Sequence, residues 1–188
     1  MKKMFILAAA CLWLFACNNE EKKDESKTDD TNKSASTSPE KKPASEILDL
    51  SAGDVIKKSF AAFSKGDVDG MTADFDDNIR YTWSGGDSVI GKKAVQDYYT
   101  GRLKLIKSIN FSNEIVLPLQ VNESQQPQVA PPGKWVLYWT AVDVTYNNGK
   151  NIKFWAHNVN HFNDAGKIDF VGQYIDRVPL MEATKGMK

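Results

Sequence analysis

Two consecutive β-hairpins near the C-terminal end constrain this chain more than any other feature of its sequence. Residues 135–146, 150–162 and 167–178 alternate between apolar and polar side chains, which is the period of a β-strand. The turns between them are Asn147–Gly149 and Asn163–Gly166, whose residue types tolerate the positive φ angles of tight turns. The sequence therefore predicts a three-stranded antiparallel meander.

The register of these hairpins assigns each side chain to a face of the sheet. We take the first turn as a two-residue loop, so the numbers of directly paired residues sum to an odd value, and the second turn gives the same parity. One face then collects Trp139, Ala141, Asp143, Ile152, Phe154, Ala156, Asn158, Asn160, Val171, Gln173 and Ile175. These apolar side chains, amides and one carboxylate are typical of a ligand pocket. The opposite face collects Tyr138, Val142, Val144, Trp155, His157, Val159, His161, Phe170, Tyr174 and Asp176, and it is too apolar to lie bare in water.

The N-terminus has the features of a bacterial lipoprotein precursor. A basic start, Met1–Lys3, precedes an apolar run over residues 4–16 that is short for a membrane span. Leu14–Cys17 resembles the lipobox, in which the cysteine is lipidated and becomes the first mature residue. Residues 1–16 are therefore predicted to be a signal peptide and Cys17 the lipid attachment site. An ordinary signal peptide or an uncleaved anchor is the alternative.

Residues 17–44 are predicted to be the lipidated cysteine and a disordered tether. Between Asn18 and Pro43 the only apolar side chain is Ala35, so the segment cannot bury enough surface to fold. Such a tether spans on the order of 30 Å. The residue after the cysteine is Asn18, not the aspartate associated with inner-membrane retention. The acidic residues Glu20, Glu21, Asp24 and Glu25 resemble the export signals of some surface lipoproteins, although a solvated linker explains them equally well. We expect an outer-membrane location, in either leaflet.

The remaining residues, 45–188, suit one domain with one core. The chain has 24 basic and 24 acidic residues and no basic stripe, so nucleic acid is not an expected partner. Cys11 lies in the signal peptide and Cys17 would carry lipid, so the mature domain has no thiol for disulfides or metal binding. No cofactor is expected.

Helices are predicted ahead of the meander. Val55, Ile56, Ser59, Phe60 and Phe63 recur at helical spacing, with Ser51 and Asp54 before them and Gly66 as a stop. Two more helices are predicted at 68–75 and 92–103, strands at 79–83 and 106–117, and a proline-rich loop at 125–133. This order predicts an α+β domain with helices on one face of a curved sheet.

Four motifs resemble the SnoaL-like branch of the nuclear transport factor 2-like superfamily. They are Lys65–Met71, Phe75–Ile79, Ile90–Val95 followed by Tyr98-Tyr99, and Phe162–Ile168. The resemblance covers essentially the whole domain and implies a cone, in which a curved antiparallel sheet wraps three N-terminal helices around a pocket. The superfamily includes polyketide cyclases, ketosteroid isomerases, dehydratases and non-catalytic binders, so the resemblance supports the fold better than any activity.

The resemblance argues against ketosteroid isomerase chemistry. That reaction needs a general base and an oxyanion hole made by a tyrosine and a protonated aspartate. The corresponding positions fall at Ser59 for the tyrosine, near Thr82 for the base and at Asn158 for the aspartate. Asn158 can still donate a hydrogen bond, but no base lies beside it in this arrangement.

Asp143 is the one carboxylate on the predicted pocket face. Buried against Trp139 and Phe154, it would have a raised pKa and could serve as a general acid or base. Alternatively, it lies near the strand end, solvated or paired with Lys150 or Lys153, and we favour this interpretation.

His157 and His161 are not expected to share a metal ion. Four residues along a strand separate their Cα atoms by about 13 Å. Both lie on the face opposite the predicted pocket, where His157 is expected to pack against Tyr138 and His161 to lie at the rim. No metal site is predicted.

The leading hypothesis is an envelope lipoprotein whose cone binds a small, partly apolar molecule or peptide without a defined reaction. Two alternatives are a cofactor-free lyase or isomerase that uses Asp143, and a non-catalytic dimeric interaction module. A homodimer through the outer sheet face is expected, because no further helix is predicted to cover that face. The expected ligand contacts are Trp83, Tyr99, Trp139, Asp143, Asn158, Asn160 and Gln173.

The lipobox predicts that Cys17→Ala leaves the precursor unlipidated. The mature form should then disappear from the membrane fraction, because no acyl chain remains to hold it there. Labelling with a fatty-acid probe measures this, and continued labelling of the variant would disprove the assignment.

Overall fold

The computed structural model describes residues 42–123 and 131–187. The predictions for Cys17, the signal peptide and the tether up to residue 41 lie outside these residues. So does most of the predicted proline-rich loop. No helix in the described ranges is long and apolar enough to cross a membrane.

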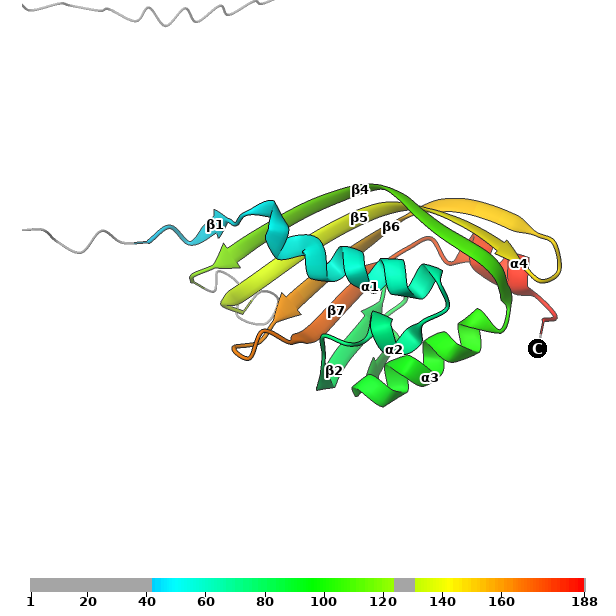
Figure 1. Cartoon of the computed structure of the whole chain (residues 1–188), viewed down its shortest axis with the longest axis horizontal. Helices are drawn as coiled ribbons and strands as arrows, with labels where there is room; N and C mark the ends of the chain where they lie inside the picture. The colour runs from blue at the N-terminus through cyan, green and yellow to red at the C-terminus, as the bar shows by residue number, and fades with distance from the viewer. Residues whose placement is uncertain (1–41, 124–130, 188) are drawn as a thin grey trace, which may run out of the picture. The chain divides into compact units, whose positions relative to one another are not determined.

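The described residues form one curved, seven-stranded sheet with helices on its concave side (Figure 1). The strand order is β1-β4-β5-β6-β7-β2-β3, and every neighbouring pair is antiparallel except β2 and β7. The α+β class with a curved sheet around the helices is confirmed. The strands are β1 (Ser45–Ile47), β2 (Phe75–Trp83), β3 (Ser88–Ile90), β4 (Ile106–Val121), β5 (Gly133–Tyr146), β6 (Asn151–Phe162) and β7 (Ile168–Tyr174).

The helices follow local signals in the sequence. They are α1 (Asp54–Ser64), α2 (Val68–Met71), α3 (Lys92–Leu103) and α4 (Val178–Thr184), with a 3-10 turn at Leu50–Gly53. α1 ends before Gly66, whose φ of 78° is the left-handed conformation that closes many helices. α2 is a single turn, shorter than the predicted helix 68–75, because the chain is already in β2 at Phe75. α3 has the predicted bounds.

The loop between β5 and β6 has three residues, not two. The amide of Tyr146 donates to the carbonyl of Lys150 (2.9 Å), and Gly149 has a φ of 85°. This is a turn followed by a left-handed residue, the commonest three-residue hairpin. Paired residues such as Tyr138 and Asn158 therefore sum to an even number, so the predicted parity of this hairpin is wrong. Between β6 and β7 the predicted odd parity is correct along the strand body.

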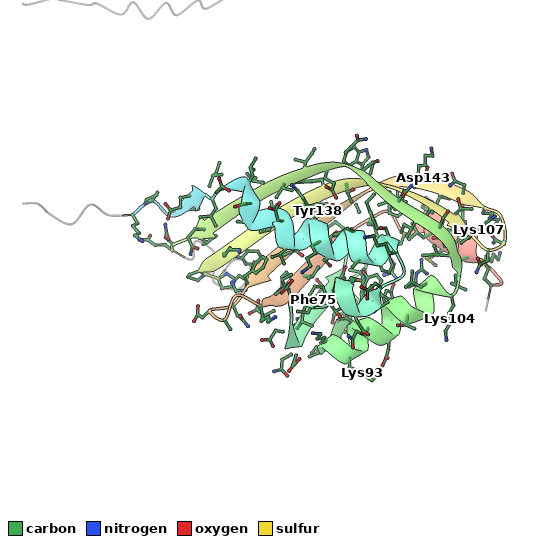
Figure 2. All side chains as sticks on the ribbon, viewed as in Figure 1. Phe75, Lys93, Lys104, Lys107, Tyr138 and Asp143 are labelled. Atoms are coloured by element: carbon green, nitrogen blue, oxygen red, sulfur yellow. The ribbon has the colours of Figure 1, made fainter. Side chains whose placement is uncertain are left out.

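The changed register exchanges the two faces of β5 and leaves those of β6 and β7 as predicted. Tyr138, Val142 and Val144 face the helices and are buried. Trp139 and Asp143 lie on the other side, so the prediction that they line the pocket is wrong. Figure 2 shows Tyr138 beside α1 and Asp143 toward the far end of the sheet.

The core lies between the concave face of the sheet and α1 to α3. Its most buried members come from every layer: Ile56, Ile79, Tyr81, Val95, Val136, Tyr138, Ile168 and Val171. A smaller cluster joins α4 to the β5–β6 hairpin through Val144, Tyr146 and Ala183. The sequence did not predict α4, a short helix with a proline in its first turn.

The outer face, turned away from α1 to α3, carries a row of rings. The Trp139 and His157 rings stack 4.5 Å apart at an angle of 3°, and the Tyr174 ring lies 5.6 Å beyond His157. The expected contact between His157 and Tyr138 is therefore wrong. Trp155 and Tyr174 are 53% and 54% exposed, so no helix in the described ranges covers them.

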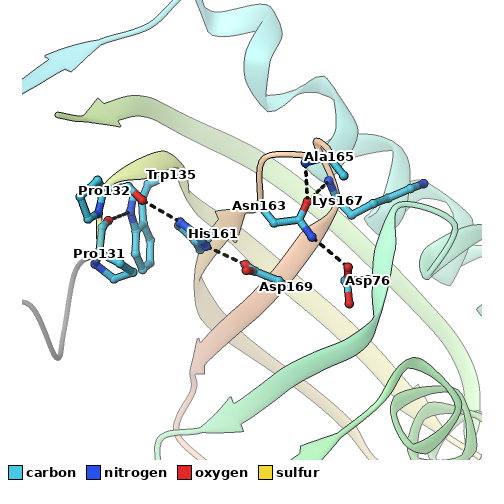
Figure 3. A network of polar contacts seen from close by, with 9 residues as sticks. All are labelled: Asp76, Pro131, Pro132, Trp135, His161, Asn163, Ala165, Lys167 and Asp169. Atoms are coloured by element: carbon cyan, nitrogen blue, oxygen red, sulfur yellow. Dashed lines mark hydrogen bonds and ion pairs between the residues drawn. The ribbon is translucent and has the colours of Figure 1, made fainter.

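His161 joins two strands at the opposite end of the same face (Figure 3). Its Nδ1 lies 2.6 Å from Asp169 Oδ1, and its Nε2 lies 3.3 Å from the carbonyl oxygen of Pro132. The ring of Trp135 packs on it at 4.7 Å, while the indole N–H donates to Pro131. Both ring nitrogens are thus occupied in structural contacts.

The three-residue loop predicts how a substitution at Gly149 changes the stability of the protein. Gly149→Ala should lower the free energy of unfolding by about 1 kcal/mol, because a Cβ disfavours the left-handed conformation. Gly101→Ala is the matched control: Gly101 lies in α3 with open space around the position of its missing Cβ. It should raise the free energy of unfolding by about 0.5–1 kcal/mol. Urea denaturation measures both, and changes of the same sign would contradict this backbone assignment.

Candidate functional site

A cavity of about 90 Å³ lies between the concave sheet face and the helices. Common pockets for drug-sized ligands start at roughly 300 Å³, so this cavity fits a compact molecule. Most of its lining is apolar: Phe60, Phe63, Met71, Ile106, Ile109, Phe111, Val142, Val144, Phe154, Ala156, Ile175 and Leu180. The polar side chains of the lining are Tyr98, Tyr99, Arg102, Tyr146 and Gln173.

One row of side chains crosses four strands behind the cavity. Trp83 on β2 is in register with Gln173 on β7, which pairs with Asn158 on β6, which in turn pairs with Tyr138 on β5. All four point to the concave side because directly paired residues share a face. Tyr99 reaches this row from α3. The helix and the sheet thus bring distant segments of the chain together.

A pair of tyrosines is the centre of the polar cluster. The hydroxyls of Tyr81 and Tyr99 share a hydrogen bond of 2.6 Å, and the Tyr99 hydroxyl lies 3.4 Å from Gln173 Oε1. Trp83 and Asn158 also lie near this pair, where their side chains favour the ionised phenols slightly. Burial raises the pKa of both phenols well above the usual value, so they remain neutral hydrogen-bonding groups at ordinary pH.

Asn158 is buried with one polar atom unsatisfied. It is 3% exposed, and its Oδ1 has no hydrogen-bond partner in the described ranges. Buried amide oxygens are nearly always paired, so an unpaired one beside a cavity is a feature that a bound polar group can satisfy. Asn160 differs: its Nδ2 donates to the carbonyl of Val136 (2.9 Å), which is a structural contact inside the sheet.

Arg102 is the single cation of the cavity lining among the residues that the structure describes. It lies in the last turn of α3 and shares the cavity lining with Tyr146 of β5, close enough for its charge to act on the phenol. Burial raises the pKa of Tyr146, and the charge of Arg102 partly opposes this rise. The cavity lining contains no Asp, Glu or His within the described ranges.

The predicted site residues therefore fall into three groups. Tyr99 and Gln173 line the cavity, and Trp83 and Asn158 lie beside them in the polar cluster. Asn160 is also buried, but its side chain hydrogen-bonds to the backbone of the neighbouring strand. Trp139 and Asp143 lie on the outer face, away from the cavity.

Asp143 is paired on the surface, as the favoured interpretation of its role proposed. Its carboxylate accepts a hydrogen bond from Asn151 Nδ2 (2.7 Å) and lies 3.0 Å from Lys153 Nζ. These partners, Asn151 first, lower its pKa. The hypothesis of a buried Asp143 with a raised pKa is wrong, because the residue faces solvent rather than Trp139 and Phe154 in a closed core.

Two of the positions expected for isomerase chemistry carry side chains that make structural hydrogen bonds. The hydroxyl of Ser59 donates to the carbonyl of Met71 (2.6 Å), and that of Thr82 donates to the carbonyl of Val171 (3.1 Å). Both hydroxyls thus bond to backbone rather than to a ligand.

Sequence reasoning missed Tyr81, Tyr98, Arg102 and Tyr146. Tyr81 alternates with Trp83 along β2, so the strand period could have placed both on one face. Arg102 follows Tyr98 and Tyr99 by four and three residues, which puts it on their side of α3. Tyr146 was missed because the wrong parity of the hairpin assigned it to the face opposite the pocket.

The family model of the SnoaL-like domain matches residues 56–170, more than half of the chain. This chain belongs to the SnoaL-like family. A proposed polyketide cyclase from Xanthomonas campestris is similar over 71% of this chain and 96% of its own, with 16% identity and a TM-score of 0.56. A proposed isomerase from Bacillus subtilis is similar over 72% and 93%, with 20% identity and a TM-score of 0.57.

A third solved structure is TerC co-crystallised with polyporic acid. It is similar over 72% of this chain and 98% of its own, with 14% identity and a TM-score of 0.53. At these identities the likeness concerns the nuclear transport factor 2-like fold alone. A search of curated protein sequences finds no match.

Proposed function

We propose that this protein is an envelope lipoprotein whose SnoaL-like domain binds a small, partly apolar ligand in its cavity. One observation carries the proposal: an apolar cavity borders the hydrogen-bonding cluster of Tyr81, Tyr99, Gln173 and Asn158. Apolar walls supply binding free energy, and a few fixed polar groups orient the ligand. The co-crystal of TerC with polyporic acid supports small-molecule binding by this fold.

Binding is favoured over catalysis by the ionisable groups of the cavity. General acid–base catalysis needs a group whose pKa lies near the working pH. The described lining offers tyrosines and one arginine, and burial moves the pKa of Tyr99 and Tyr146 further from neutrality. Asp143, the acid or base of the lyase or isomerase alternative, lies outside the cavity.

The location of the protein is part of the proposal. Lipidation at Cys17 would hold it to the outer membrane, and residues 18–44 would separate the domain from the lipid surface. The lipobox-like sequence and the polar composition of residues 18–43 support this arrangement.

Filling the cavity should prevent binding. Ala156 is buried in the lining, so Ala156→Leu adds atoms where a ligand would lie. Mass spectrometry of small molecules extracted from the purified protein should find a ligand in the wild type and at least about tenfold less of it in this variant. Ala141→Leu is the matched control, because Ala141 is on the outer face of the neighbouring strand.

Thermal melting establishes that both variants are folded before extraction. If a molecule is retained equally by the wild type, the cavity variant and the control, it is not held in this cavity. That outcome would contradict the proposed binding site.

We also propose a homodimer through the outer face. Ile115, Trp155 and Tyr174 are each more than half exposed there, and Trp139 and His157 add further ring surface. Exposed aromatic surface of this kind is characteristic of protein interfaces. A second copy is the simplest partner because a twofold axis lets the same patch serve both subunits.

Trp155→Asp should separate this dimer, since it places an unpaired carboxylate in a dry contact. Light scattering of the unlipidated domain at tens of micromolar should give the dimer mass for the wild type and the monomer mass for the variant. Ser64→Asp, on the exposed side of α1, is the control and should remain dimeric. A monomeric wild type would overturn the proposal.

A further inference from the structure

The charge of the cavity is unbalanced. Arg102 contributes one positive charge, and the described lining contains no carboxylate. Arg102 lies near the neutral hydroxyl of Tyr146, which can occupy only part of a guanidinium that carries five N–H donors. Within the described ranges, no ion pair of Arg102 is observed.

Such an arginine is costly unless an anion completes its contacts. Arg102 is half-buried and shares the cavity with Ile106, Val144 and Leu180. A cation in apolar surroundings loses hydration that only a charged or strongly polar partner restores. The C-terminal end of α3 compensates in part, because its carbonyl groups favour a positive charge.

We infer that the ligand of this cavity is a small carboxylic acid with an apolar body, whose carboxylate is bound by Arg102 and Tyr146. This inference rests on the proposed binding function and names the class of ligand. The guanidinium fork matches a carboxylate in two parallel hydrogen bonds, and the Tyr146 hydroxyl lies beside it. The single arginine of the described lining balances the one charge of a carboxylate, whereas a phosphate monoester carries close to two charges.

The rest of the cavity suits the body of such an acid. The aromatic rings of Phe60, Phe63, Phe111 and Phe154 enclose a space suited to a single ring or a short alkyl chain. Tyr99 precedes Arg102 by about one turn of α3, so the polar cluster can contact a substituent near the same end.

Two positive charges outside the cavity also favour an anionic ligand. Lys104 and Lys107 follow Arg102 at this end of the molecule, and both are exposed (Figure 2). A group of like charges raises the local concentration of small anions and speeds their association. These lysines are not part of the cavity lining, so we expect them to affect rate more than selectivity.

A matched pair of ligands tests the inference. Isothermal titration of the intact chain with 3-phenylpropanoate and with its uncharged amide, 3-phenylpropanamide, compares the same body with and without the charge. The wild type should bind the acid at least about tenfold more tightly than the amide, the difference of one charge-assisted contact. Arg102→Met should bring the two affinities together.

Two further variants separate charge from structure. Lys104→Met removes a charge two residues away, outside the cavity, and should keep the preference for the acid. Arg102→Lys keeps the charge without the planar fork and should retain a reduced preference. Far-ultraviolet circular dichroism establishes that each variant is folded.

The outcomes distinguish this inference from the proposed function. Equal binding of acid and amide by the wild type, or a preference that survives Arg102→Met, would overturn the acid as ligand class and leave small-molecule binding in place. Absence of binding by both ligands would overturn the inference. If no extracted molecule depended on Ala156 either, the proposed function would fail as well.

Discussion

The left-handed conformation of Gly149 fixes the register of β5 against β6, and the cavity depends on that register. With three residues in the loop, Tyr138, Val142 and Val144 turn toward the helices. A shift by one residue would bury Asp143 and expose Tyr138, because the side-chain period of a strand is two. Exposing a large aromatic ring and burying an unpaired carboxylate both cost free energy, so packing and loop geometry select the same register.

The cavity derives its polar character largely from one helix. α3 places Tyr99 toward the sheet row of Trp83, Gln173 and Asn158, and it places Arg102 one turn later beside Tyr146. The remaining walls are apolar side chains of α1, α4 and the concave sheet face. Among the described residues, this distribution provides hydrogen bonds and one positive charge, and the lining has no carboxylate or imidazole. A binding role follows more readily from it than a proton-transfer reaction.

Other proteins with this fold are proposed polyketide cyclases and isomerases. Sharing this fold does not imply the same reaction, because activity is determined by the side chains that line the cavity. In this chain, the hydroxyls of Ser59 and Thr82 bond to backbone carbonyls and Asp143 is paired with Lys153 on the surface. The interior positions are instead filled by tyrosines, amides and an arginine.

The sequence by itself determined the elements whose signals are local. The bounds of α3, the stop of α1 at Gly66, the bodies of β5 to β7 and the resemblance to the SnoaL-like family were all predictable, because periodicity, capping and turn residues act over a few positions. Only the tertiary structure decided which face of β5 is inside. Asn147–Gly149 is compatible with a two-residue or a three-residue loop, and packing against α1 distinguishes them. The Tyr81–Tyr99 and Arg102–Tyr146 contacts could not be predicted from the sequence either. They join strands to a helix across the core, and sequence spacing carries no information about such contacts.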